Sequence, residues 1–123
     1  MIALDTSVLI EALGAGGSMR DELRAALAAG ERIVLPALVL YEWLRGPRLD
    51  EELEAQAALF PDQEAIAFGT DEVSMAADLY RTVSRPRGSE IDLAIAACAI
   101  SWNAALWTLN RDDFGDVPGL RLR

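Results

Sequence analysis

Short apolar segments alternate with longer amphipathic stretches along the whole chain. We predict strands at the short segments, which cover residues 1–4, 33–35, 65–68 and 105–109, with 120–122 as a fifth strand. Apolar residues recur at helical spacing in the longer stretches, which predicts helices over 6–13, 18–29, 36–45, 49–59, 71–84 and 89–101. Strands that alternate with helices in this way are typical of an α/β fold, in which a parallel sheet carries helices on both faces.

Residues typical of helix ends support these boundaries. Ser18 and Asp21 have the spacing of a capping box, and Gly30 is a suitable end for the helix that they begin. Pro36 suits the first position of the next helix, where a backbone N–H has no partner in any case, and Gly46-Pro47 closes that helix.

Length and composition predict one domain over residues 1–123. The chain is 52% apolar, so it can bury a core without disulfides, and no Pro/Gly/Ser-rich stretch is long enough for an interdomain linker. Its first residues lack the basic and apolar regions of a secretory signal, and no apolar run approaches the roughly 20 residues that span a bilayer. We therefore expect a cytoplasmic protein without a membrane partner.

The absence of certain residue types limits the catalytic groups and metal ligands that the chain can supply. The chain has no histidine and no lysine, and Cys98 is its only cysteine, within a run of small apolar residues that predicts a buried hydrophobe. Histidine triads, lysine Schiff bases, the phosphate-loop lysine, disulfides and Cys/His zinc sites are thereby excluded. Asp, Glu, Arg and Tyr remain, and a group of carboxylates is a natural host for a hard cation such as Mg²⁺ or Mn²⁺.

Two acidic segments lie where parallel sheets bind ligands, at the carboxyl ends of strands. Asp5 follows the first predicted strand, and Asn110-Arg111-Asp112-Asp113 follows the fourth. An aspartate between a strand and a helix is also a common N-cap, and this alternative for Asp5 is compatible with metal binding.

Glu42 lies at the edge of an apolar stripe, four and three residues after Leu38 and Val39. An ionised carboxylate is seldom buried without a partner, so Glu42 is a candidate site residue. The alternative is a simple ion pair with Arg45 one turn along the helix.

Asp92 faces the apolar side of its predicted helix, with Ile95, Ala96 and Ala99 one and two turns further on. Burying a lone carboxylate there costs several kcal/mol unless a cation or hydrogen-bond donors compensate. The alternative is a capping box with Ser89, which explains an aspartate in the first turn but not its apolar surroundings.

The net charge of −9 argues against a polyanionic partner, because nucleic-acid-binding proteins usually present a basic surface. Divalent ions bound among the carboxylates would reverse the local potential. Every basic residue is an arginine, suited to bidentate phosphate contacts, and several fall in predicted loops, including Arg85 and Arg87 in a basic loop and Arg111 after the fourth strand.

Four segments in this order resemble the PIN-domain ribonucleases, in particular the VapC-type toxins of toxin–antitoxin pairs. They are Ile2-Ala3-Leu4-Asp5-Thr6-Ser7-Val8-Leu9-Ile10, Pro36-Ala37-Leu38-Val39-Leu40-Tyr41-Glu42, Asp92-Leu93-Ala94-Ile95-Ala96-Ala97, and Leu106-Trp107-Thr108-Leu109-Asn110-Arg111-Asp112-Asp113-Phe114 followed by Pro118-Gly119-Leu120. Each segment is unspecific alone, but their order and spacing make the resemblance specific, and it covers essentially the whole chain.

The resemblance implies a three-layer α/β sandwich with a five-stranded parallel sheet and a Mg²⁺- or Mn²⁺-dependent ribonuclease activity. It places Asp5, Glu42 and Asp92 at the acidic metal-site positions, with Thr6 or Ser7 as a polar neighbour. Asn110 stands where many members have an acid, and Asp113 matches an acid found in others, so both are candidate ligands and Asp113 a candidate catalytic residue. A homodimer, an RNA substrate guided by Arg85, Arg87 and Arg111, and an inhibitory antitoxin are further implications.

Two other functions agree less well with the residues. A haloacid-dehalogenase-like phosphatase would use Asp5 as a nucleophile, but it requires a second aspartate at position 7, which is a serine, and a lysine to hold the phosphate. An interaction module would bind a basic peptide in the acidic groove without catalysis, and isothermal titration with Mn²⁺ separates it from an enzyme.

Overall fold

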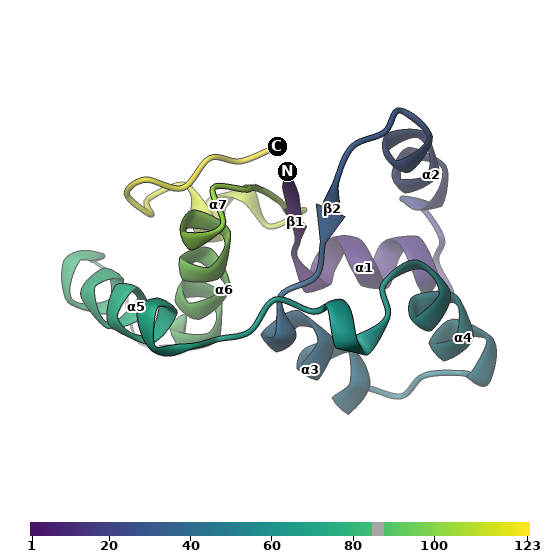
Figure 1. Cartoon of the computed structure of the whole chain (residues 1–123), viewed down its shortest axis with the longest axis horizontal. Helices are drawn as coiled ribbons and strands as arrows, with labels where there is room; N and C mark the ends of the chain where they lie inside the picture. Colours follow the sequence, from purple (N-terminus) through teal and green to yellow (C-terminus); the bar gives the residue numbers. More distant parts are fainter. Residues whose placement is uncertain (85–87) are drawn as a thin grey trace.

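A small parallel sheet at the centre of the molecule positions the helices (Figure 1). The computed structural model describes residues 1–84 and 88–123. Strands β1 (Ile2–Leu4), β2 (Ile33–Val34) and β3 (Ala105–Trp107) are parallel, in the order β2-β1-β3. The helical elements are α1 (Thr6–Leu13), α2 (Arg20–Ala28), α3 (Ala37–Arg45), α4 (Asp50–Leu59), the 3-10 helix η1 (Asp62–Glu64), α5 (Thr70–Thr82), α6 (Glu90–Ser101) and α7 (Arg111–Phe114).

The prediction of five strands was wrong, because the described residues form a three-stranded sheet and two isolated bridges. In segment 65–68 only Ile66 pairs, opposite Pro36, and pairing stops because Ala37 already begins α3. In segment 120–122 only Leu122 pairs, opposite Leu106, following the turn at Gly119, whose φ is 79°. Each segment therefore joins the sheet through a single bridge and forms no ladder.

The core covers the central strand on both faces. All three residues of β1 are buried, and because successive strand side chains point to opposite faces, neither face is open to water. In Figure 1, α5 and α6 lie on one side of β1 and β2, and α1 and α2 on the other. Helix α5 packs along α6, which also contacts α3, β3 and α7. This explains why α6 is buried continuously from Leu93 to Ala99.

The structure confirms the interpretation of Cys98 as a buried hydrophobe. Its side chain is fully buried in α6. Burial, with a smaller contribution from the charge of Glu72, raises the pKa of the thiol to about 11. A thiol that is neutral at physiological pH is a poor nucleophile and metal ligand.

Two local features differ from the predicted boundaries. Helix α2 begins at Arg20 with Met19 as its N-cap and without a side-chain capping hydrogen bond, so the predicted capping box is absent, and the hydroxyl of Ser18 donates to Glu11 (2.8 Å). Residues 111–114, predicted as a loop, form the one-turn helix α7. Within the described residues, every helix is too short or too polar to cross a membrane.

Candidate functional site

A hollow lies at the carboxyl end of β1, and we call it the acidic hollow. It has a volume of about 420 Å³. Elements far apart in the sequence build it, because α1, α3, the first turn of α6 and the turn after β3 all contribute lining residues. Its lining residues are Asp5, Thr6, Ser7, Ile10, Glu11, Glu42, Asp92, Leu109 and Asn110.

Asp5 is held by two hydroxyl groups. Its side chain is 4% exposed, and its Oδ2 accepts hydrogen bonds from Ser7 Oγ (2.8 Å) and Thr108 Oγ1 (2.7 Å). Asp5 is the N-cap residue of α1, but its side chain makes no capping hydrogen bond, so capping does not explain this carboxylate. The hydrogen bonds that described residues donate to Asp5 all end on Oδ2, which leaves Oδ1 available to a ligand.

Thr108 is a site residue that the sequence did not reveal. It is 3% exposed and follows directly after β3, next to β1 in the sheet. Its hydroxyl accepts from the backbone N–H of Asn110 (3.0 Å), and the hydroxyl of Ser7 accepts from that of Leu109 (3.0 Å). Each hydroxyl has one hydrogen, so accepting these bonds directs that hydrogen to Asp5. A threonine at a strand end is too common a feature to have predicted this role.

Glu42 enters the hollow from α3. Its Oε1 accepts a hydrogen bond from Thr6 Oγ1 (2.6 Å), so Thr6 orients this carboxylate while Ser7 orients Asp5. The predicted alternative is also present, because Arg45 approaches Glu42 Oε2 at 3.4 Å. That ion pair is long and partly exposed, and such pairs contribute little to stability.

Asp92 enters from the first turn of α6. Its capping-box alternative is not supported, because Ser89 makes no side-chain capping hydrogen bond. Burial and then the charges of Asp5, Glu42 and Asp113 raise the pKa of Asp92 from 3.8 to about 6. The predicted carboxylates are therefore close enough to repel one another.

Asn110 and Asp113 are placed differently. Asn110 lines the acidic hollow, whereas Asp113 lines an adjoining hollow of about 350 Å³, formed by residues 109–113. The two hollows share Leu109 and Asn110. Asp113 acts on the site through its charge, which contributes to the raised pKa of Asp92.

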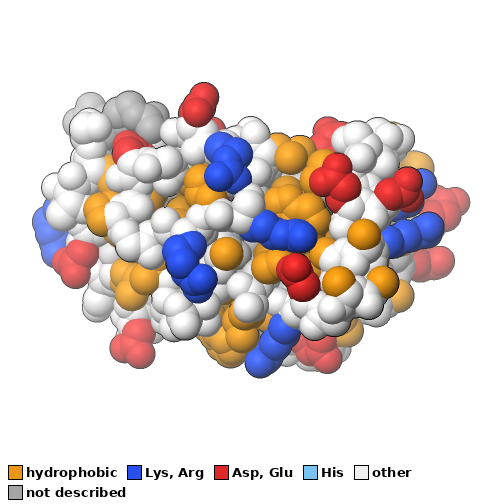
Figure 2. Space-filling model, turned by 90° about the horizontal axis from the view of Figure 1, so that it is seen from above, with side chains coloured by type: hydrophobic (Ala, Val, Ile, Leu, Met, Phe, Trp, Pro, Cys, Tyr) orange, Lys and Arg blue, Asp and Glu red, His pale blue; other side chains and the backbone are white. Residues whose placement is uncertain are grey.

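Of the three predicted RNA-binding arginines, the described residues include Arg111. Arg85 and Arg87 lie outside the described residues. Arg111 donates to the backbone carbonyl oxygen of Arg123 (2.5 Å), which turns it toward the end of the chain. On the face shown in Figure 2, basic side chains are scattered among acidic and apolar ones and form no continuous band.

The donor set of the acidic hollow suits a hard divalent cation. Carboxylate and amide oxygens are the ligands that Mg²⁺ and Mn²⁺ prefer, and a cation would offset both the burial and the neighbouring charges that raise the pKa of Asp92. In residues 1–84 and 88–123, no three acidic or cysteine side chains are already grouped closely enough to hold an ion. Binding therefore requires the carboxylates to rotate inward.

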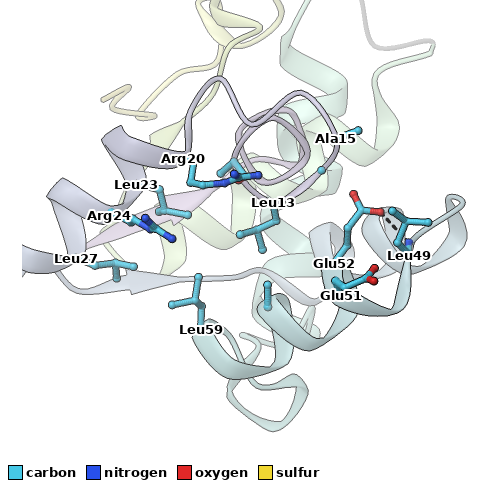
Figure 3. A pocket seen from close by; sticks show the side chains of 13 residues that line it. Leu13, Ala15, Arg20, Leu23, Arg24, Leu27, Leu49, Glu51, Glu52 and Leu59 are labelled. Carbon is cyan, nitrogen blue, oxygen red and sulfur yellow. Dashed lines mark hydrogen bonds between the residues drawn. The ribbon is translucent and has the colours of Figure 1, made fainter.

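A second hollow, which we call the apolar hollow, lies between α1, α2 and α4 and has a volume of about 390 Å³ (Figure 3). Leu13, Leu23, Leu27 and Leu59 point into it. Arginines 20 and 24 stand on its α2 side, and glutamates 51 and 52 on its α4 side. It shares no lining residue with the acidic hollow.

Comparisons with known proteins place the chain in a structural context. The family model described as PIN domain matches residues 2–120. No sequence match links the chain to a protein of curated function. Similar solved structures include DNA-bound VapBC from Salmonella typhimurium, with a TM-score of 0.80 and 19% identity over 99% of this chain and 96% of that chain. VapBC2 from Rickettsia felis, bound to a promoter DNA fragment, has a TM-score of 0.78 and 24% identity over 100% and 98% of the two chains.

FitAcB from Neisseria gonorrhoeae is also similar, with a TM-score of 0.72 and 19% identity over 100% of this chain and 97% of that chain. At these identities the matches show a shared fold. The architecture is therefore PIN-like, with a smaller sheet than the sequence predicted.

Proposed function

The chain belongs to the PIN-domain family, and from this membership and its acidic hollow we propose that it is a metal-dependent endoribonuclease. The observation that carries the proposal is the convergence of Asp5, Glu42 and Asp92, from three separate elements, on one hollow. Their mutual repulsion destabilises the protein when no cation is bound, and perturbed carboxylates in a hollow are typical of functional sites.

Asp5, Glu42 and Asp92 would hold Mg²⁺ or Mn²⁺, with Asn110 or Asp113 as further ligands. The ion, when bound, supplies stabilisation of charge on the phosphoryl oxygens and an acidified water as nucleophile. Ser7 and Thr108 hold Oδ2 of Asp5 and leave Oδ1 for ligation, while Thr6 fixes Oε1 of Glu42. These hydrogen bonds restrict the side chains of Asp5 and Glu42, which lowers the cost of the rotation that would bring their free oxygens to the ion.

RNA cleavage by the purified chain tests the proposal. We expect cleavage of structured and single-stranded RNAs with Mg²⁺ or Mn²⁺, and its loss when a chelator removes the ion. Isothermal titration should detect Mn²⁺ binding that depends on Asp5 and Asp92. Cleavage that persists in chelator would refute the metal role, and absence of both cleavage and site-specific Mn²⁺ binding would favour an interaction module.

We further propose that the chain is the toxin of a toxin–antitoxin pair and that its partner occupies the apolar hollow. The similar solved structures are VapBC and FitAcB complexes, which supports a partner protein. Leu59 is 43% exposed at the hollow, so water contacts apolar surface that a partner would cover. The arginines on the α2 side and the glutamates on the α4 side suit an amphipathic helix. Its apolar face would enter the hollow, and its polar edges would carry charges of both signs. A homodimer remains a further proposal.

Co-expression with the small protein encoded by a neighbouring reading frame tests the partner. We expect a stable complex in which RNA cleavage is inhibited, and a Leu59→Asp variant that keeps its activity but escapes inhibition. Leu44→Asp is the matched control, because Leu44 is 47% exposed but lies outside the apolar hollow. Equal inhibition of both variants would exclude the apolar hollow as the binding surface.

A further inference from the structure

An acidic nuclease site needs positive charge near its mouth to bind RNA, and most described arginines are engaged elsewhere. Arg20 and Arg48 donate to backbone carbonyl oxygens, Arg121 binds Asn103, and Arg123 pairs with Glu31. Arg45 is different. Within residues 1–84 and 88–123, it is the arginine that pairs with a carboxylate of the acidic hollow.

The ion pair of Arg45 is weak enough to be exchanged. Its guanidinium lies 3.4 Å from Glu42 Oε2, and the side chains of Arg45 and Glu42 are 51% and 18% exposed. Exposed pairs of this kind contribute between 0 and about 1 kcal/mol. A divalent cation at Glu42 would replace Arg45, and the guanidinium would then be free at the edge of the hollow.

Tyr41 lies next to this guanidinium. It precedes Arg45 by one helical turn, and the ring centroid is 5.2 Å from the Arg45 guanidinium carbon. The tyrosine is 54% exposed although its helix contributes Val39, Leu40 and Trp43 to the core. The outer edge of α3 therefore presents an aromatic ring, then a guanidinium, then a carboxylate of the acidic hollow.

We propose that Tyr41 and Arg45 form the RNA-binding edge of the site, in which a base of single-stranded RNA stacks on Tyr41 and Arg45 binds a phosphate beside the cleaved one. This inference rests on the proposed ribonuclease function and adds the residues that select an unpaired strand. Aromatic rings stack with any base, and arginine binds phosphate with two parallel hydrogen bonds. The arrangement also explains how a chain of net charge −9 would bind a polyanion, because the Arg45 guanidinium stands where the RNA strand enters the hollow.

The test measures binding and cleavage separately. Binding of a fluorescent single-stranded oligoribonucleotide to the chain with its carboxylates intact is followed by anisotropy in Ca²⁺, which carboxylate oxygens also bind but which replaces the Mg²⁺ or Mn²⁺ proposed to support cleavage. Tyr41→Ala should raise Kd about five- to a hundredfold, whereas Tyr41→Phe should bind like the parent. Arg45→Ala should raise Kd and lower the salt dependence, log Kd against log salt, by about 0.7, the contribution of one phosphate contact.

The chain offers a matched control pair on another helix. Tyr80 is 38% exposed, and its neighbour Arg81 forms an ion pair with Asp78 at the same one-turn spacing as Arg45 with Glu42. Tyr80→Ala and Arg81→Ala should leave Kd within about twofold of the parent. In the otherwise wild-type chain, Arg45→Ala should bind Mn²⁺ as tightly as wild type or tighter, because a competing cation has been removed.

Three outcomes would overturn the inference. The first is an RNA affinity of Tyr41→Ala and Arg45→Ala equal to that of the control pair. The second is parallel loss of Mn²⁺ and RNA affinity in Arg45→Ala, which would make Arg45 a support for Glu42. The third is a change of oligomeric state in Tyr41→Ala with unchanged RNA binding, which would assign this edge to a protein contact. Wild-type cleavage with any of these leaves the proposed function intact, whereas a wild type without cleavage refutes that function itself.

Discussion

Asp5→Asn is expected to lower the rate of RNA cleavage by at least about a hundredfold while the protein stays folded. Asparagine has the size of aspartate, and its carbonyl oxygen can still accept the hydrogen bonds that Ser7 and Thr108 donate to Oδ2. What disappears is the negative charge on the atom best placed to bind a cation. The initial cleavage rate at saturating Mn²⁺ measures the effect, and circular dichroism with urea denaturation confirms the fold.

Two comparisons give this experiment its meaning. Asp50→Asn removes an exposed aspartate in the first turn of α4, outside the acidic hollow, and should cleave like wild type. Mn²⁺ affinity should fall in Asp5→Asn and stay constant in Asp50→Asn. An Asp5→Asn protein that binds Mn²⁺ and cleaves RNA at the wild-type rate would show that the acidic hollow is not the active site.

The carboxylates were predictable because they break the apolar pattern around them. Glu42 borders a buried stripe and Asp92 lies on an otherwise apolar helix, so each raises the question of what compensates its charge. Asp5 was predictable for a topological reason, since the carboxyl end of a parallel strand faces the ligand. The family resemblance then connected three positions that no local pattern links, and the acidic hollow contains all three.

The hydrogen bonds that hold these carboxylates in place were not predictable. Thr108 reaches Asp5 because β1 pairs with β3 in the register that sets Leu4 opposite Trp107, and a register is a property of the folded sheet. The predicted number of strands was wrong for a related reason. Apolar character identified 65–68 and 120–122 as segments that join the sheet, but strand length depends on how long the neighbouring chain stays extended, and the onset of α3 at Ala37 ends it.

Asp92→Asn is expected to stabilise the metal-free protein at pH 7.5 by about 1–2 kcal/mol although it removes activity. The folded protein raises the pKa of Asp92 from 3.8 to about 6, chiefly through burial and then through the charges of Asp5, Glu42 and Asp113. This difference corresponds to about 3 kcal/mol, which solvent screening of a partly exposed side chain reduces to about 1–2 kcal/mol.

The sign follows from proton linkage. Between pH 3.8 and about 6 the folded state binds more protons at Asp92 than the unfolded state does, so the free energy of unfolding falls as pH rises through this window. Below it the aspartate is protonated in both states and imposes no penalty. Above it the folded protein carries the full cost of a charged carboxylate among others. Asparagine has no such titration, so the gain in stability should be present at pH 7.5 and nearly absent at pH 3.5.

Urea denaturation in chelator at both pH values measures this difference, with Glu90→Gln as the matched control. Glu90 is an exposed acid in the same first turn of α6, so its replacement removes the favourable interaction with the helix N-terminus but relieves no crowding. Glu90→Gln should be neutral or slightly destabilising. If Asp92→Asn behaved likewise, neither burial nor the neighbouring charges would destabilise the ionised Asp92 in solution. A stabilised but inactive variant would show instead that the site keeps a buried charge beside other carboxylates at a cost in stability because function requires it.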